Sequence, residues 1–170
     1  MGCNKGYNLT TLSYIGDYEL WGIEPSEYAI LNSQVPENVL ILERDCFDIP
    51  FYNNFFDLIF TSGVLMHVAP EDLSKAVREM VRVSNRYILI IEYYSEKETS
   101  IPYHGFQDLL WKRDYKPIFE NNGLRCIEKG FLSKEDGFDS CTYWLFEKWL
   151  RTLEPVLSVG KMEQILVPSH

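Results

Sequence analysis

The chain has 170 residues and a formal net charge of −9, because 25 Asp and Glu outnumber 16 Lys and Arg. This acidic balance excludes recognition of nucleic acid through its phosphate backbone, which needs a basic face. The length predicts one domain, and 46% hydrophobic residues supply enough apolar side chains for a core. The longest apolar runs have only the length of strands, so we expect no transmembrane helix, and no apolar signal region opens the chain.

Apolar runs of strand length alternate with helical patterns along the chain. Strands are expected at the four apolar runs 19–24, 38–43, 56–60 and 86–92. A helix that opens on proline is expected from Pro25 to Ser33. The clearest helix spans 70–84, because its apolar residues keep the spacing of one helix face. A helix broken at Pro117 is expected over 106–122, before a terminating glycine at Gly123.

The order of these elements predicts the fold class. Alternating strands and helices indicate an α/β fold with a Rossmann-like, doubly wound, mostly parallel sheet. The segments RCIEKGFL and CTYWLFEKW are expected to close this sheet as an antiparallel pair. We expect one domain over residues 1–148 and a C-terminal extension over 149–170. Ligands bind beyond the carboxyl ends of the strands in such sheets, so chemistry is expected directly after each strand.

The four cysteines lie far apart in the sequence and form no Cys-x-x-Cys pair. This spacing predicts neither a metal centre nor a disulfide framework. Free thiols persist in a reducing compartment, so we expect a cytoplasmic protein.

A glycine turn and an acidic strand end suggest a cofactor site. Gly2 and Gly6 allow close approach of the backbone to a ligand, although an ordinary turn is the alternative. Glu24 ends the first strand, where a carboxylate can accept hydrogen bonds from both hydroxyls of a ribose, unless it is simply a surface acid. The spacing does not fit the Gly-x-Gly-x-x-Gly fingerprint that holds a pyrophosphate. An adenosine cofactor without phosphate is therefore favoured over a nicotinamide cofactor.

Five segments in order resemble the class I S-adenosylmethionine-dependent methyltransferases. They are GCNKG, GIEPS, RDCFDIPF, FDLIFTSGVLMHV and LSKAVREMVRVSNRYILIIE, and together they cover residues 2–94 with their connections. The resemblance implies S-adenosyl-L-methionine as the cofactor, a small-molecule acceptor, and no nucleic-acid or membrane partner. The cofactor-binding residues that it implies are Gly2, Cys3, Asn4 and Gly6 at the methionine part, Glu24 and Pro25 at the ribose, Asp45, Cys46 and Phe47 at the adenine, and Thr61, Ser62 and Gly63 under the methionine.

The later segments YHGFQDLLWKRDY and GFLSKEDGFDSCTYWLFEK resemble the methylases associated with pseudaminic acid biosynthesis. This implies a sugar-like acceptor with a hydroxyl or amine nucleophile. His104 stands where that subgroup carries arginine.

Candidate catalytic and substrate residues lie near the end of the fourth strand and in segment 103–114. His104 is the candidate general base, with an unperturbed pKa near ~6.5, and a surface loop histidine is the alternative. Tyr93 is a second catalytic candidate. The candidate substrate contacts are Tyr94, Tyr103 and Arg113. Arg113 can hold a carboxylate or phosphate with two parallel hydrogen bonds, or belong to a solvated helix face.

The family resemblance also implies a central first strand before the glycine turn, and Met1 stands where that strand would end. We therefore expect this strand to be missing or replaced. Three explanations stay open: a relative with impaired cofactor binding, a homo-oligomer whose neighbouring copy covers the gap, or a docked tail segment, 155–159 or 164–168. A tail helix over 149–153 is the alternative for the extension. Two other functions also stay open: a catalytically impaired binding or structural protein, and an NAD-dependent oxidoreductase.

Overall fold

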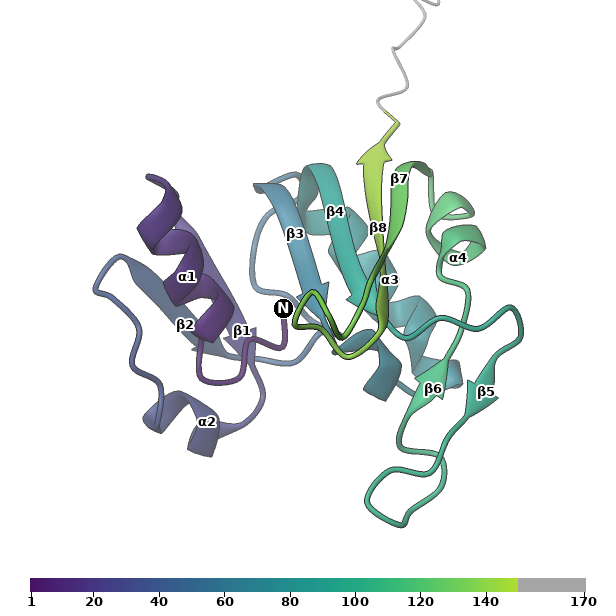
Figure 1. Cartoon of the computed structure of the whole chain (residues 1–170). Helices are drawn as coiled ribbons and strands as arrows, with labels where there is room; N and C mark the ends of the chain where they lie inside the picture. The colour runs from purple at the N-terminus through teal and green to yellow at the C-terminus, as the bar shows by residue number, and fades with distance from the viewer. Residues whose placement is uncertain (150–170) are drawn as a thin grey trace, which may run out of the picture.

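The computed structural model describes residues 1–149 and has the predicted α/β architecture (Figure 1). The helices are α1 (Tyr7–Ile15), α2 (Glu27–Leu31), the 3₁₀ helix η1 (Leu65–His67), α3 (Pro70–Val83) and α4 (Lys116–Glu120). The strands are β1 (Leu20–Glu24), β2 (Val39–Glu43), β3 (Phe56–Ser62), β4 (Ser84–Glu92), β5 (Thr99–Ser100), β6 (Trp111–Lys112), β7 (Leu124–Leu132) and β8 (Cys141–Lys148).

The main strands form two separate sheets within these residues. β1 and β2 make a parallel pair, and β3, β4, β8 and β7 make a four-stranded sheet in that order. β3 and β4 run parallel, whereas β8 is antiparallel to both β4 and β7. The predicted α/β class and antiparallel closing pair are therefore confirmed, and the four predicted strands coincide with β1 to β4.

The core lies where α3 packs on β3, β4 and β8. Pro70 opens α3 and acidic residues fill its first turn, where they face the positive end of the helix dipole. Ala76, Val77 and Met80 of α3 are completely buried, as are Ile88 and Trp144 of the sheet. Truncating a buried side chain such as Met80 to alanine should cost about 2–5 kcal/mol. This core holds the carboxyl ends of β3 and β4 in place.

Two predicted helices are wrong in extent, and one was not predicted. α2 begins only at Glu27, because Ser26 caps it by accepting a hydrogen bond from Ala29 N at 3.2 Å. In the predicted helix 106–122 only Lys116–Glu120 is helical, because the chain before it turns at Asp108 (φ 57°) and pairs with β5. α1 has no apolar stripe that would reveal it, and of its residues only Leu9 is buried.

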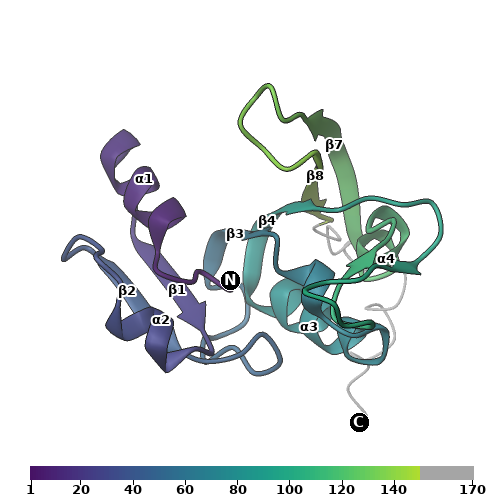
Figure 2. The same cartoon turned by 60° about the horizontal axis from the view of Figure 1, so that its bottom comes forward.

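The predicted gap in the sheet is confirmed within the described residues, because β1 and β3 share no ladder. Residues 1–3 lie between them at their carboxyl ends. Met1 N donates to Phe60 O at 2.9 Å and Cys3 N donates to Ile23 O at 3.1 Å. Figure 2 shows the N-terminus between β1 and β3, with α1, β1, β2 and α2 grouped on one side of it. Residues 1–3 thus occupy only the last part of a central strand position.

Candidate active site

The loop formed by residues 1–6 has a backbone that only certain residues allow. Gly2, Asn4 and Gly6 all have positive φ, at 62°, 50° and 80°, a region open to glycine and tolerated by asparagine. A Cβ on Gly2 would lie 2.7 Å from a methyl group of Val64. The loop therefore rests directly against the segment that follows β3, and a side chain at position 2 would push the two apart.

Glu24 ties this loop to the end of β1. It is 9% exposed, its Oε2 accepts from Asn4 N at 2.8 Å, and its Oε1 accepts from Ser26 N at 3.1 Å. An ionised carboxylate has roughly four acceptor positions. Glu24 therefore orders the loop and keeps acceptor capacity for a hydroxyl-bearing ligand.

The segment after β2 lies beside Glu24. Arg44 N donates to Glu24 O at 3.2 Å, and Asp45 Oδ1 accepts from Phe47 N at 2.8 Å, which closes a turn. Burial raises the pKa of the Cys46 thiol to about 11, so Cys46 is uncharged at neutral pH. Next to it, Phe47 is partly buried. The turn thus offers one carboxylate and two largely apolar neighbours, a set that suits a heteroaromatic ring with an exocyclic amine.

Glu92 organises the loop after β3, although it was not among the predicted site residues. Its carboxylate is fully buried and accepts from Val64 N, Leu65 N and Met66 N at 3.1 Å each. It also accepts from the buried hydroxyl of Thr61 at 2.8 Å. Burial raises the pKa of Glu92 in spite of these hydrogen bonds. The available signal was an acid that closes an otherwise apolar strand.

Arg113 holds the same loop from the other side. Its side chain is 2% exposed, so the predicted alternative of a solvated helix face is wrong. The guanidinium donates to Leu65 O at 3.3 Å and Val68 O at 3.1 Å, and its Nε lies 2.9 Å from a carboxylate oxygen of Glu98. The contacts described for Arg113 are with other residues of the chain, so its contact with substrate stays a prediction.

Aromatic and imidazole rings gather next to η1. Tyr103 packs edge-on against His104 and His67, with ring centroids 4.3 and 5.1 Å away. His67 Nδ1 lies 3.0 Å from Leu109 O, so this nitrogen carries the proton of that hydrogen bond. His104 is exposed and has φ 49°, a backbone region that is uncommon for residues other than glycine. We call His67, Tyr103 and His104 the histidine–tyrosine cluster.

The remaining predicted residues are distributed around this edge. Burial raises the pKa of the Tyr93 phenol, with a further contribution from the Asp139 carboxylate, so Tyr93 keeps its proton at neutral pH. Tyr94 lies apart, against β7 and β8, with Lys129 Nζ 4.2 Å from its ring centre. Ser62 and Pro25 are exposed, and Gly63 has φ 65° and donates to Ile91 O at 2.9 Å.

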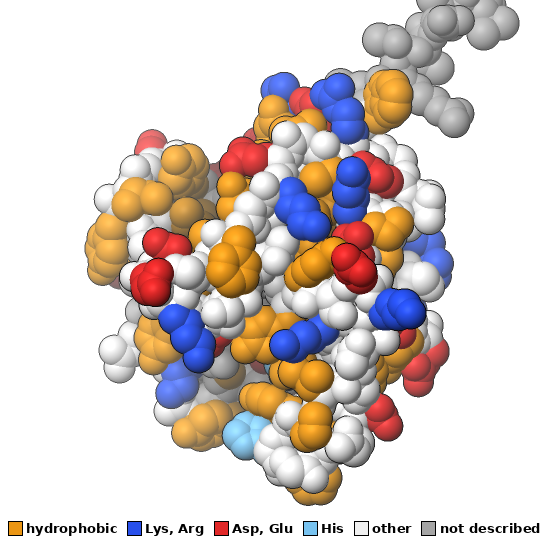
Figure 3. Space-filling model, turned by 45° about the vertical axis from the view of Figure 1, so that its right-hand side comes forward, with side chains coloured by type: hydrophobic (Ala, Val, Ile, Leu, Met, Phe, Trp, Pro, Cys, Tyr) orange, Lys and Arg blue, Asp and Glu red, His pale blue; other side chains and the backbone are white. Residues whose placement is uncertain are grey.

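The described surface mixes side chains of both charges. On the face drawn in Figure 3, basic and acidic side chains are interspersed with apolar ones rather than forming a continuous basic area. Within residues 1–149, no group of three His, Cys, Asp or Glu is placed to hold a metal ion. No helix in that same range is long and apolar enough to cross a bilayer.

Comparisons with known proteins give a consistent picture. The methyltransferase domain family matches residues 1–86. A 1,6-didemethyltoxoflavin-N1-methyltransferase from Burkholderia thailandensis, crystallised with S-adenosylhomocysteine, superimposes with a TM-score of 0.72 at 13% identity over 86% of this chain and 68% of that one. A putative S-adenosylmethionine-dependent methyltransferase from Listeria monocytogenes gives 0.67 at 12% identity, covering 87% and 88%.

Proteins that share this fold can catalyse different reactions. The [4+2]-cyclase SpnF superimposes with a TM-score of 0.68 at 14% identity, over 86% of this chain and 73% of that one. A comparison with curated protein sequences gives no significant match. The family match covers half of the chain and includes the glycine loop, Glu24, Asp45 and the loop after β3. The chain therefore belongs to the methyltransferase domain family.

Proposed function

We propose that this enzyme transfers a methyl group from S-adenosyl-L-methionine to a hydroxyl or amine of a small, sugar-like metabolite. One observation carries the proposal: the left-handed loop 1–6, the Glu24 carboxylate and the turn at Asp45 meet at one edge of the sheet. The 2.8 Å hydrogen bond from Asn4 N to Glu24 and the 3.2 Å hydrogen bond from Arg44 N to Glu24 O join these segments directly.

The donor set at this edge fits an adenosine cofactor with a methionine part. In our proposal the spare acceptor positions of Glu24 receive the ribose hydroxyls, with Pro25 beside them. Asp45 accepts from the adenine amine, and Cys46 and Phe47 flank the ring. The methionine part lies along the loop 1–6 and over residues 61–63. The bound cofactor supplies an electrophilic methyl group on a positively charged sulfur.

The chain's own residues then orient the acceptor and take its proton. Holding two reactants in line supplies most of the acceleration in such a transfer, with effective molarities that reach roughly 10⁵–10⁸ M. His104 is the proposed base, because it is exposed, lies in the histidine–tyrosine cluster and carries an imidazole, the side chain that most often serves as a general base. Tyr93 serves as a hydrogen-bond donor in this proposal, since its raised pKa keeps its proton in place.

The acceptor class rests on two kinds of support. Segments 103–115 and 130–148 resemble methylases of pseudaminic acid biosynthesis, which favours a sugar-like substrate. The aromatic rings of Tyr93 and Tyr103 suit the apolar faces of a sugar ring, whereas Tyr94, which lies apart against β7 and β8, stays a predicted substrate contact. A cytoplasmic location fits the four free thiols, Cys3, Cys46, Cys126 and Cys141.

Calorimetric titration with S-adenosylmethionine and S-adenosylhomocysteine tests the cofactor site. Glu24→Ala should weaken binding by roughly 10- to 150-fold, the equivalent of about 1.5–3 kcal/mol for hydrogen bonds to a charged group. Glu43→Ala is the matched control, because Glu43 pairs in register with Glu24 but is exposed. Equal losses in both variants would contradict the assignment. A wild-type chain without affinity for either ligand would favour the catalytically impaired binding protein.

A further inference from the structure

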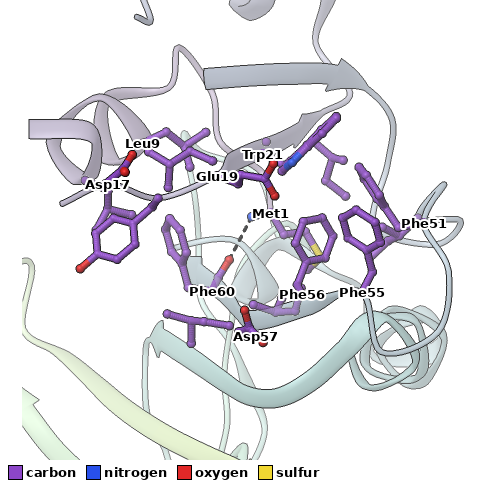
Figure 4. A pocket seen from close by; sticks show the side chains of 18 residues that line it. Met1, Leu9, Asp17, Glu19, Trp21, Phe51, Phe55, Phe56, Asp57 and Phe60 are labelled. Carbon is purple, nitrogen blue, oxygen red and sulfur yellow. Dashed lines mark hydrogen bonds between the residues drawn. The ribbon is translucent and has the colours of Figure 1, made fainter. Parts of the chain in front are cut away.

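A cavity of about 730 Å³ separates the two sheets (Figure 4). Leu20 and Trp21 of β1 line one side, Phe56 and Leu58 of β3 line the other, and Met1 closes the end nearest the cofactor edge. Leu58 is 47% exposed although it sits in a strand next to the core. We call this space the strand slot.

The two walls of the strand slot are sheet edges. β1 pairs only with β2, and β3 pairs only with β4, so within residues 1–149 the facing edges of β1 and β3 have no strand partner. At the carboxyl ends of the two walls, Met1 donates a hydrogen bond to β3 and Cys3 donates one to β1, as the last residues of an intervening strand would. Figure 4 shows the bond from Met1 to Phe60 among the aromatic side chains of the lining. The slot therefore matches one extended apolar segment that pairs on both edges.

The last described strand, β8, ends at the same end of the sheet as the entrance of this slot. Lys148 Nζ donates to Asn54 Oδ1 at 2.6 Å, and Asn54 lies two residues before β3 begins at Phe56. β8 runs opposite to β3 and β4, so the chain leaves the sheet at the edge where a parallel strand in the slot would enter (Figure 1). The slot lies three strand spacings from β8, roughly 14 Å. Residues 150–163 span up to roughly 46 Å when extended, which is ample.

We propose that residues 164–168 of this chain, QILVP, occupy the strand slot as a strand parallel to β1 and β3. Both candidate tail segments lie outside the described residues, so the choice rests on their sequences. A strand of a parallel sheet that is covered on both faces is typically an unbroken apolar run, as Ile165, Leu166 and Val167 are, whereas Ser158 interrupts the segment 155–159. Pro168 lacks an N–H and ends the run where residues 1–3 begin to pair with the walls.

Charge at the entrance supports the same choice. The exposed carboxylates of Asp17, Glu19 and Asp57 lie at the amino ends of the two walls and contribute to the slot lining. Lys161 precedes the segment 164–168 by three residues and can approach them. A strand in the slot would join the two sheets into one. It would also hold β3 and β1 in place, to which the loop 1–6 is bonded through Met1 and Cys3. The consequence for cofactor affinity rests on the proposed function.

Hydrogen exchange on the full-length chain tests the docking. Amides in peptides covering 19–24 and 55–60 should exchange slowly in the wild type and at least about tenfold faster in Ile165→Asp. Val156→Asp is the matched control and should leave both peptides protected. Peptides covering β4 and β8 serve as the internal reference, because their ladder does not involve the slot. If Ile165→Asp loses protection everywhere, the milder Ile165→Ser should still lose it first at β1 and β3.

Other outcomes overturn the proposal. Loss of protection in Val156→Asp instead would assign the slot to 155–159, and fast exchange of both wall peptides in the wild type would exclude docking of either tail segment. Light scattering should give a monomer; a dimer that dissociates in Ile165→Asp would assign the slot to the tail of a second copy. Titration with S-adenosylhomocysteine separates the two proposals. Slow amide exchange in the two wall peptides together with no affinity for S-adenosylhomocysteine would contradict the proposed function and still support the docking.

Discussion

Thr61 donates its hydroxyl hydrogen to the Glu92 carboxylate across 2.8 Å, and neither side chain reaches solvent. This contact joins the ends of β3 and β4 at the point where three backbone N–H groups also converge on Glu92. The N–H groups at the start of η1 have no partner within that helix. The buried Glu92 carboxylate accepts hydrogen bonds from them in place of water. Glu92 is a positioning residue for the loop that we assign to the methionine part of the cofactor.

Replacing Glu92 by glutamine should destabilise the protein by about 1–3 kcal/mol, because the amide turns a donor toward N–H groups that need an acceptor. Urea unfolding would measure the change in the free energy of unfolding. Glu96→Gln is the control, since Glu96 is exposed on the following segment. An unchanged unfolding midpoint in Glu92→Gln would contradict this role.

Stability should fall in acid partly because of Glu79. Its side chain accepts from Arg82 at 2.7 Å and from Ile49 N at 2.9 Å, and the hydrogen bond to Arg82 is the main reason that the pKa of Glu79 lies below 4.5. The stabilisation is therefore complete above about pH 4.5 and is lost as the pH falls through the folded-state pKa. Glu79→Gln should cost about 1–3 kcal/mol at pH 7 and less at pH 3.

Urea unfolding at the two pH values checks this dependence on Glu79. Glu96→Gln provides the control, because Glu96 is exposed and lies outside the helices and strands. The same loss at pH 3 as at pH 7 in Glu79→Gln would show that the carboxylate charge is not the cause.

Gly2→Ala should weaken S-adenosylhomocysteine binding by more than tenfold. The backbone at φ 62° disfavours a Cβ, and the added atom would meet Val64 at 2.7 Å, so the loop must move away from the segment after β3. Gly137→Ala is the control, because Gly137 also has positive φ but its Cβ would meet no heavy atom within 4 Å. Calorimetric titration of both variants measures the two affinities, and equal affinities would show that the backbone at Gly2 does not support the cofactor site.

Arg113→Lys should lower stability by about 1–3 kcal/mol although the charge is kept. A lysine ammonium cannot reach two carbonyls and Glu98 together as the planar guanidinium does. Thermal unfolding with and without cofactor measures the effect, and Arg125→Lys is the exposed control. Full stability in Arg113→Lys would remove its structural role and favour the predicted contact with substrate.

Sequence patterns located the strands and α3 well because these patterns are local. The continuous apolar run before Glu92 and the helical spacing after Pro70 each describe burial of one element. The region 106–115 was misjudged because its conformation depends on distant partners: Trp111 pairs with Ser100, and Arg113 is drawn into the core by the carbonyls of residues 65 and 68. Pattern alone cannot anticipate such contacts.

The sequence by itself determined the α/β class and the membership of the methyltransferase family, and it pointed to the glycine loop, Glu24 and Asp45, whose contact with the cofactor stays a prediction. Those features follow from the order of elements and from turn chemistry, which are encoded over short stretches. Only the tertiary structure decided that Glu92 and Arg113 clamp the loop after β3, and that β1 and β3 face each other across an apolar slot. Burial, hydrogen-bond partners and free sheet edges arise between residues far apart in the chain, so only the folded arrangement reveals them.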